Sequence, residues 1–188
     1  INIPTFVKNI ERGEFLEAAR VLKETSALPA VCGRVCPQEK QCESKCIHLK
    51  MGKPAVAIGY LERFAADYER ESGNISIPEV AEKNGIKIAV VGSGPAGLSF
   101  AGDMAKRGYD VTVFEALHEI GGVLKYGIPE FRLPNKIVDV EIEGLRKMGV
   151  KFMTNCIVGK TISYDDLHAD GFKGIFAASG AGLPNFMN

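Results

Sequence analysis

The chain lacks an excess of charge of either sign, because its 188 residues include 23 lysines and arginines and 23 aspartates and glutamates. No long run of like charge occurs, so nothing points to a nucleic acid or an anionic membrane surface as a partner. No apolar run approaches the roughly 20 residues that span a bilayer, and no signal-peptide pattern is present. With 46% hydrophobic residues, the composition predicts a globular cytoplasmic protein without membrane association.

The sequence also lacks a methionine at its first position, and it stops at Asn188 shortly after a presumed strand. We therefore expect a piece of a longer protein. None of the three histidines has a recognisable partner for nucleophilic or acid–base catalysis, so no catalytic side chain is predicted. Any chemistry is expected to come from bound cofactors.

What the chain does contain is a glycine-rich turn between two apolar runs, in IAVVGSGPAGLSFAGDMAKRGYDVTVFE. The first run, 88–91, leads into Gly92-x-Gly94-x-x-Gly97, and a helix-forming stretch separates it from a second run that ends at Glu115. This order of strand, turn, helix and strand is typical of a dinucleotide site. Gly92 permits the tight turn, Gly94 lets the backbone approach a pyrophosphate, and Gly97 lets the helix pack closely on the strand.

Glu115 lies 18 residues after Gly97, where a carboxylate can accept hydrogen bonds from a ribose 2′-hydroxyl. A 2′-phosphate would be repelled there, so NADP is disfavoured at this position. The helix N-terminus adds free N–H groups and the positive end of the helix dipole for the phosphates. NAD and FAD both fit this pattern. Gly121-Gly122 and the segment 174–180 favour FAD, because both resemble accessory motifs of flavoprotein reductases that have two dinucleotide domains.

The hydrophobic periodicity changes along the chain. Residues 1–71 have helical periodicity, residues 72–85 are rich in polar, glycine and proline positions typical of a linker, and residues 86–188 alternate strand and helix patterns. The predicted fold class is α/β, with a small all-α domain before the first part of a Rossmann-like parallel sheet that binds FAD or NAD(P). Strands are expected over 86–91, 110–115, 150–154 and 174–178, helices over 55–71, 95–107 and 135–148, and loops over 32–54 and 116–134.

Four of the five cysteines, Cys32, Cys36, Cys42 and Cys46, lie within fifteen residues. Disulfides need an oxidising compartment, and zinc prefers closely spaced pairs in tetrahedral sets. The observed spacings favour iron–sulfur ligation, with zinc and disulfides as alternatives. Cys156 lies apart in an apolar context and is expected to fill the core.

The blocks LPAVCGRVCPQEKQCESKC, AIGYLERF, IAVVGSGPAGLSFA and GGVLKYGIPEFRLP resemble the small (β) subunit family of NADPH-dependent glutamate synthase. The same blocks occur in the N-terminal half of dihydropyrimidine dehydrogenase and in the large subunit of NADH-dependent ferredoxin:NADP oxidoreductase. The resemblance implies an oxidoreductase that passes electrons from NAD(P)H through FAD to iron–sulfur clusters. The implied partner is a large catalytic subunit or a ferredoxin-type electron acceptor.

The resemblance further implies two [4Fe–4S] clusters. Cys36, Cys42 and Glu62 would ligate one of them and Cys46 the other, whereas Cys32 matches a family cysteine that is not a ligand. The alternative for Glu62 is a solvated position on a helix. The family has four more cysteines upstream, so we do not expect these residues alone to complete a cluster.

On the FAD side, the resemblance assigns a contact to each of Gly92, Gly94, Pro95, Ala96 and Gly97 at the pyrophosphate, Glu115 at the ribose, Gly122, Val123 and Leu124 along the cofactor, Val158 at the adenine and Gly180 towards the ribityl chain. The family's nicotinamide domain follows this stretch, so we expect no NAD(P)H oxidation from these residues alone. The alternative from another functional class is a non-catalytic nucleotide-binding or assembly module with structural cysteines.

Overall fold

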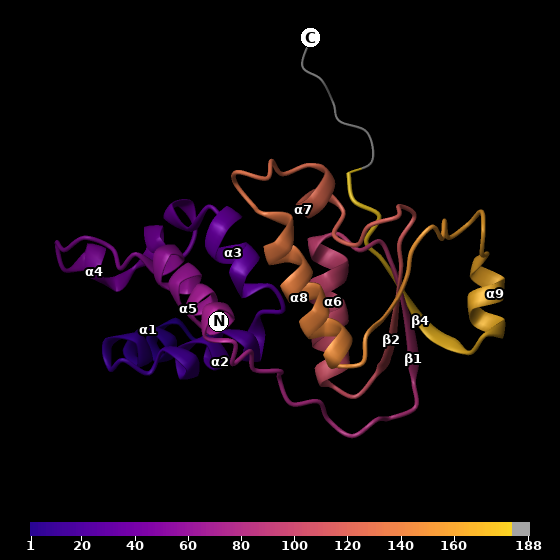
Figure 1. Ribbon diagram of the computed structural model, residues 1–188, viewed down its shortest axis with the longest axis horizontal. Helices are drawn as coiled ribbons and strands as arrows, with labels where there is room; N and C mark the ends of the chain where they lie inside the picture. The colour runs from indigo at the N-terminus through magenta and orange to yellow at the C-terminus, as the bar shows by residue number, and fades with distance from the viewer. Residues whose placement is uncertain (182–188) are drawn as a thin grey trace, which may run out of the picture.

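The first part of the chain is helical, as the computed structural model, which describes residues 1–181, shows in Figure 1. Its helices are α1 (Ile3–Glu11), α2 (Phe15–Thr25), α3 (Pro29–Val35), α4 (Ile47–Lys50) and α5 (Ile58–Ser72). Two short 3₁₀ turns, Gln38–Lys40 and Glu43–Lys45, lie between α3 and α4. The apolar faces of α1, α2 and α5 meet around Phe6, Leu22 and Ala65, which are fully buried.

The second part is a parallel sheet of four strands in the order β3-β2-β1-β4. The strands are β1 (Lys87–Val91), β2 (Asp110–Phe114), β3 (Lys151–Met153) and β4 (Phe172–Ala177), and the helices are α6 (Pro95–Lys106), α7 (Val123–Tyr126), α8 (Asn135–Lys147) and α9 (Tyr164–Ala169). Helices α6 and α8 cover one face of the sheet and α9 lies on the other (Figure 1). This strand order is that of the first half of a dinucleotide-binding sheet, which confirms the predicted fold class.

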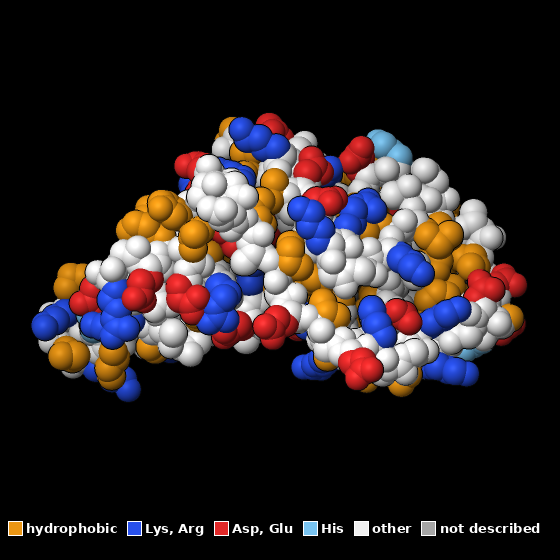
Figure 2. Space-filling view, turned by 60° about the horizontal axis from the view of Figure 1, so that its bottom comes forward, with side chains coloured by type: hydrophobic (Ala, Val, Ile, Leu, Met, Phe, Trp, Pro, Cys, Tyr) orange, Lys and Arg blue, Asp and Glu red, His pale blue; other side chains and the backbone are white. Residues whose placement is uncertain are grey.

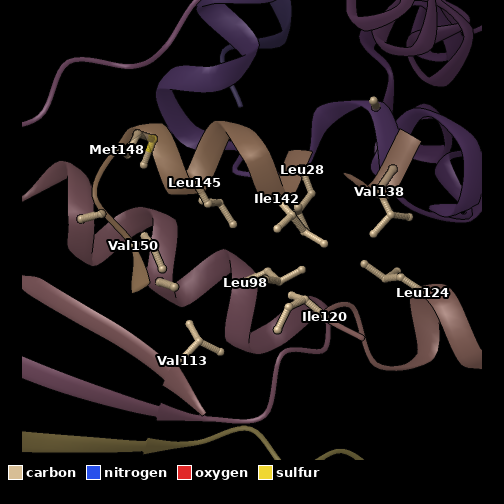
Figure 3. Packing of buried hydrophobic residues seen from close by; sticks show 14 of the residues in the cluster. Leu28, Leu98, Val113, Ile120, Leu124, Val138, Ile142, Leu145, Met148 and Val150 are labelled. Carbon is tan, nitrogen blue, oxygen red and sulfur yellow. The ribbon is translucent and has the colours of Figure 1, made fainter. Parts of the chain in front are cut away.

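The hydrophobic period of each element explains how it packs. Helix α8 places Val138, Ile142 and Leu145 on one face, three or four residues apart. Ile142 and Leu145 point towards α6, which carries Leu98, and Val138 lies opposite Leu124 of α7 (Figure 3). Burial of one such side chain stabilises the fold by roughly 1.5–3 kcal/mol. The row of apolar side chains therefore fixes α8 above α6 and the sheet.

The hydrophobic core of the sheet extends into the helical part. Leu28 and Val31 lie in the same buried cluster as Ile142 and Leu145, and Figure 3 shows Leu28 beside Ile142. Because one core is shared, the helical part and the sheet pack as neighbours rather than as separate bodies joined only by a chain.

The segment between α5 and β1 is fixed by backbone hydrogen bonds. The N–H of Ala81 donates to the carbonyl of Lys106 at 2.9 Å, and the N–H of Asn84 donates to the carbonyl of Gly108 at 3.0 Å. Gly108 has a φ of +83°, and a Cβ there would lie 2.2 Å from the carbonyl oxygen of Glu82. The stretch predicted as a linker therefore runs along the C-terminal end of α6.

Four short helices lie where no helix was expected, and one of them, α4, lies inside the expected loop 32–54. Pro29 begins α3, since a proline at the first helical position loses no hydrogen bond. Helix α7 lies inside the expected loop 116–134. Helix α9 begins with a capping box between Ser163 and Asp166, a local signal that the hydrophobic pattern did not reveal.

The surface mixes acidic, basic and apolar side chains, and Figure 2 shows this mixture over one face. The largest exposed apolar side chains of the α4 region are Ile47 and Met51, which are 61% and 59% exposed. Across residues 1–181, no helix has both the length and the apolar character that a bilayer crossing requires.

Candidate functional site

The glycine turn connects β1 to α6 and has the steric constraints that the motif predicts. Gly92 has a φ of +101°, and a Cβ there would lie 2.3 Å from the carbonyl oxygen of Ala178 at the end of β4. A Cβ on Gly97 would lie 2.0 Å from the carbonyl oxygen of Gly92. Only glycine fits at these two positions, because the turn, α6 and β4 approach one another there.

Gly94 differs from the other two glycines, because a Cβ there would meet nothing within 4 Å. It is the N-cap of the twelve-residue helix α6, and the exposed residues Pro95 and Ala96 form the first turn of that helix. Open space therefore lies in front of free backbone N–H groups and the positive end of the helix dipole. This cradle fits the pyrophosphate of a dinucleotide.

Glu115 follows β2, and its carboxylate is 6% exposed. Oε2 accepts hydrogen bonds from the N–H of Ser93, at 2.8 Å, and from the Ser93 hydroxyl. Oε1 accepts the N–H of Leu117 at 2.9 Å. A carboxylate offers about four acceptor positions, so these three bonds leave one position on Oε1 for a ribose hydroxyl.

The Gly121–Gly122 turn packs directly on the glycine turn. Gly122 has a φ of +53°, and a Cβ there would lie 2.9 Å from Cα of Gly94. The predicted contact residues Val123 and Leu124 point in different directions, since Val123 is 54% exposed and Leu124 is 2% exposed within the core. Through Gly122, the structure brings this segment to the predicted pyrophosphate cradle.

The remaining two predicted contacts are Gly180 and Val158. Gly180, with a φ of +75°, follows the end of β4, and the N–H of Ala178 in that segment donates to the carbonyl of Val91. Val158 packs against the cluster on the α9 side of the sheet. The segment before it is joined to the site because the N–H of Cys156 donates to the carbonyl of Glu115 at 2.9 Å.

The cysteine segment begins inside α3, which contains Cys32, and continues towards α5. Cys32, Cys36, Cys42 and Cys46 are free thiols of intermediate burial. Burial raises the pKa of each of the thiols of Cys36 and Cys42, and the carboxylate of Glu62 raises both further. Burial, with Glu62 as the next cause, raises the pKa of Cys32 to about 11. Among residues 1–181, no three histidine, cysteine or acidic side chains are gathered closely enough to hold a metal ion, so the structure does not bring Cys36, Cys42 and Glu62 together as a ligand set.

Glu62 is the unusual side chain beside these cysteines. It lies on α5 with 4% exposure, and its Oε1 has no hydrogen-bond partner in the part of the chain that the structure describes. Burial raises the pKa of this carboxyl to about 7. Burial of a carboxylate without a partner is costly. The free oxygen of Glu62 therefore fits the role of a ligand to an iron–sulfur cluster, which the cysteines also suggest. The alternative of a solvated helix position does not agree with this burial.

Two side chains that sequence reasoning missed attach the cysteine segment to α5. Nε2 of Gln38 donates to the carbonyl of Cys32 at 2.7 Å, and Oε1 of Glu43 accepts the N–H of Gly59 at 3.0 Å. A Cβ on Gly59 would lie 2.4 Å from Cδ of Gln38. The close approach at Gly59 thus presses the cysteine loop against the start of the helix that carries Glu62.

Buried charges join the helical part to the sheet. Oε1 of Glu141 on α8 accepts the N–H of Ala30 on α3 at 2.7 Å. Burial raises the pKa of Glu141 to about 7, although the hydrogen bond from Ala30 opposes this rise. Close by, Nζ of Lys23 and Oε2 of Glu69 form an ion pair of 2.5 Å with little exposure.

Two protein-family models match separate stretches of the chain. Residues 1–74 match the model described as dihydropyrimidine dehydrogenase domain II, 4Fe-4S cluster. Residues 90–149 match the model of an NAD(P)-binding Rossmann-like domain. The cysteine segment and Glu62 fall in the first match, and the glycine turn and Glu115 fall in the second.

Curated relatives align with almost the whole chain. The NAD-dependent dihydropyrimidine dehydrogenase subunit PreT of Escherichia coli (strain K12) is 40% identical over 184 residues, which cover 96% of this chain and 44% of that protein. The glutamate synthase [NADPH] small chain of the same strain is 37% identical, over 95% of this chain and 37% of its own length. The NADP(+)-dependent formate dehydrogenase subunit beta of Moorella thermoacetica is 36% identical, over 96% and 28%. The chain therefore spans less than half the length of these three relatives, and the resemblance seen in the sequence is confirmed.

Proposed function

We propose, from the premise that this chain is a relative of glutamate synthase small chains and PreT subunits, that it forms the FAD- and iron–sulfur-binding part of an NAD(P)H-dependent oxidoreductase. One observation carries the flavin half of this proposal. The glycine turn, Glu115 and the Gly121–Gly122 turn meet at the carboxyl end of the strands. A dinucleotide binds at that edge in open α/β sheets.

The residues of the turn would do most of the binding. Gly94 and the first turn of α6 would donate backbone N–H groups to the pyrophosphate, and Oε1 of Glu115 would accept a hydrogen bond from the adenosine ribose. Gly122, Val123 and Leu124 would run along the cofactor, with Val158 at the adenine and Gly180 at the ribityl chain. When bound, FAD supplies a centre that accepts a hydride from NAD(P)H and releases single electrons.

In the helical part, Cys36, Cys42 and Glu62 would hold one iron–sulfur cluster and Cys46 would serve another. The support is the buried, unpartnered oxygen of Glu62 beside the cysteines. Thiolates and a carboxylate supply the negative charge that an iron centre needs. A cytoplasmic location belongs to this proposal, because free thiols persist in a reducing compartment. The electrons would leave to a large catalytic subunit or a ferredoxin-type acceptor.

A protein that carries these residues together with the four upstream cysteines of the family, purified without oxygen and supplied with FAD, iron and sulfide, tests this proposal. We expect flavin absorption bands and a broad iron–sulfur shoulder in the visible spectrum. Cys36→Ser and Cys42→Ser should lower the iron content, whereas the matched control Cys156→Ser should leave it unchanged. A colourless protein that binds zinc at the same cysteines would instead support a non-catalytic module with structural cysteines.

A further inference from the structure

Ser93 lies between the first two glycines of the turn and is 0% exposed. Its hydroxyl donates to Oε2 of Glu115 and accepts the N–H of Gly121 at 2.9 Å. Its own backbone N–H donates to the same Oε2 at 2.8 Å. A serine hydroxyl has a single proton to donate, so the bond to Glu115 fixes the orientation in which it can accept from Gly121.

These bonds connect three segments that are far apart in the sequence. The glycine turn follows β1, Glu115 follows β2, and Gly121 belongs to the turn before α7. Gly121 is buried, and its neighbour Gly122 lies against Gly94. Removal of the Ser93 hydroxyl would leave the N–H of Gly121 without its acceptor and would take one donor from Glu115.

The hydrogen bonds also decide which oxygen of Glu115 remains available. The two donors of Ser93 occupy both acceptor positions of Oε2, whereas Leu117 occupies only one position of Oε1. A ribose hydroxyl is therefore directed to Oε1. Without the Ser93 hydroxyl, the carboxylate could rotate and offer a different oxygen.

We propose that Ser93 is a positioning residue of the nucleotide site. Its hydroxyl fixes the Gly121–Gly122 turn against the pyrophosphate cradle and directs Oε1 of Glu115 to the 2′-hydroxyl of the adenosine ribose. This inference rests on the proposed function, because it requires a dinucleotide at the glycine turn. It adds a ribose-selecting role to a position that the glycine motif leaves unspecified.

Titrations of FAD, ADP and 2′-deoxy-ADP into wild type, Ser93→Ala and Ser99→Ala test the inference. Ser99 is an exposed residue of α6 and serves as the matched control. We expect Ser93→Ala to weaken FAD binding about ten- to a hundredfold, as loss of a hydrogen bond to a charged group does. Wild type should prefer ADP over 2′-deoxy-ADP about tenfold, and this preference should nearly vanish in Ser93→Ala. A merely structural role would weaken both ligands equally and leave the ratio unchanged.

Amide hydrogen exchange in the nucleotide-free protein gives a second readout. Exchange at Gly121 should accelerate in Ser93→Ala and remain unchanged in Ser99→Ala. If Ser93→Ala does not fold, Ser93→Cys replaces it, because cysteine retains the volume and weakens the hydrogen bonds. Ser93→Cys should then show weaker FAD binding, a smaller preference for ADP over 2′-deoxy-ADP and faster exchange at Gly121.

Each outcome separates the two claims. Equal FAD affinity, or an unchanged ratio of ADP to 2′-deoxy-ADP, in the Ser93 variant would overturn the role of Ser93 and leave the proposed function standing. If wild type binds none of the three ligands, the proposed function fails and the Ser93 inference fails with it.

Discussion

Replacement of Glu141 by glutamine should change how the stability of the protein depends on pH. Burial raises the pKa of this carboxyl from 4.5 to about 7, against the opposing effects of the Ala30 N–H, Lys23 and Arg34. The folded protein therefore binds a proton that the unfolded chain has released between these two values. Stability falls as the pH rises through this window, and the loss is complete above the folded pKa.

The size of the effect follows from the shift. At 1.36 kcal/mol per pKa unit, a rise from 4.5 to about 7 corresponds to roughly 3 kcal/mol. Glu141→Gln keeps an oxygen for the N–H of Ala30 and cannot ionise. We expect it to match wild type near pH 5 and to exceed it by up to roughly 3 kcal/mol at pH 8. With a urea slope of about 2 kcal/mol per molar, this moves the unfolding midpoint by roughly 1.5 M.

Urea unfolding of reduced, cofactor-free protein between pH 5 and 8.5 measures this difference. Burial also raises the carboxyl pKa of Glu62 to about 7, so Glu62 makes the stability of both proteins depend on pH. Only the difference between the two proteins therefore reports on Glu141. Glu143→Gln, an exposed change on the same helix, should give a curve parallel to wild type. A parallel curve for Glu141→Gln would refute this account of the buried carboxyl.

Other substitutions test the remaining features. Gly97→Ala should prevent folding, since its Cβ would overlap the carbonyl of Gly92. Gly94→Ala should leave the melting temperature unchanged and weaken FAD binding at least about tenfold. Melting curves and FAD titrations of the two variants test this contrast. Glu62→Ala should lower the iron retained after reconstitution, with unchanged iron content as the contrary result. Lys23→Met should destabilise the protein by about 3–5 kcal/mol, because Glu69 is left as an unpaired buried charge. Urea unfolding measures the free energy of unfolding, and a loss below about 1 kcal/mol would contradict the role of the pair.

Much of the sheet could be predicted because its signals are local. The β-branched run before Gly92 and the apolar period of α8 each depend on neighbouring residues. The glycine turn likewise predicted a nucleotide cradle, since its steric demands follow from the residue type.

The hydrogen-bond partners could not be predicted in the same way. Ser93 occupies a position that the glycine motif leaves open, and its bonds to Glu115 and Gly121 depend on the packing of three segments that are separate in the sequence. The bond between Glu141 and Ala30 joins residues 111 positions apart. No periodic pattern encodes such a pair, because it arises only when the two parts of the fold come together.

The shared core also has a consequence for how the protein is made. Leu28 and Val31 leave the ribosome long before Ile142 and Leu145, against which they pack. At roughly 5–20 residues per second, synthesis of the intervening stretch takes on the order of ten seconds. During that time α3 has α5 beside it but not α8, and a nascent chain that stalls before α8 would present the uncovered apolar residues to chaperones or to other unfinished chains.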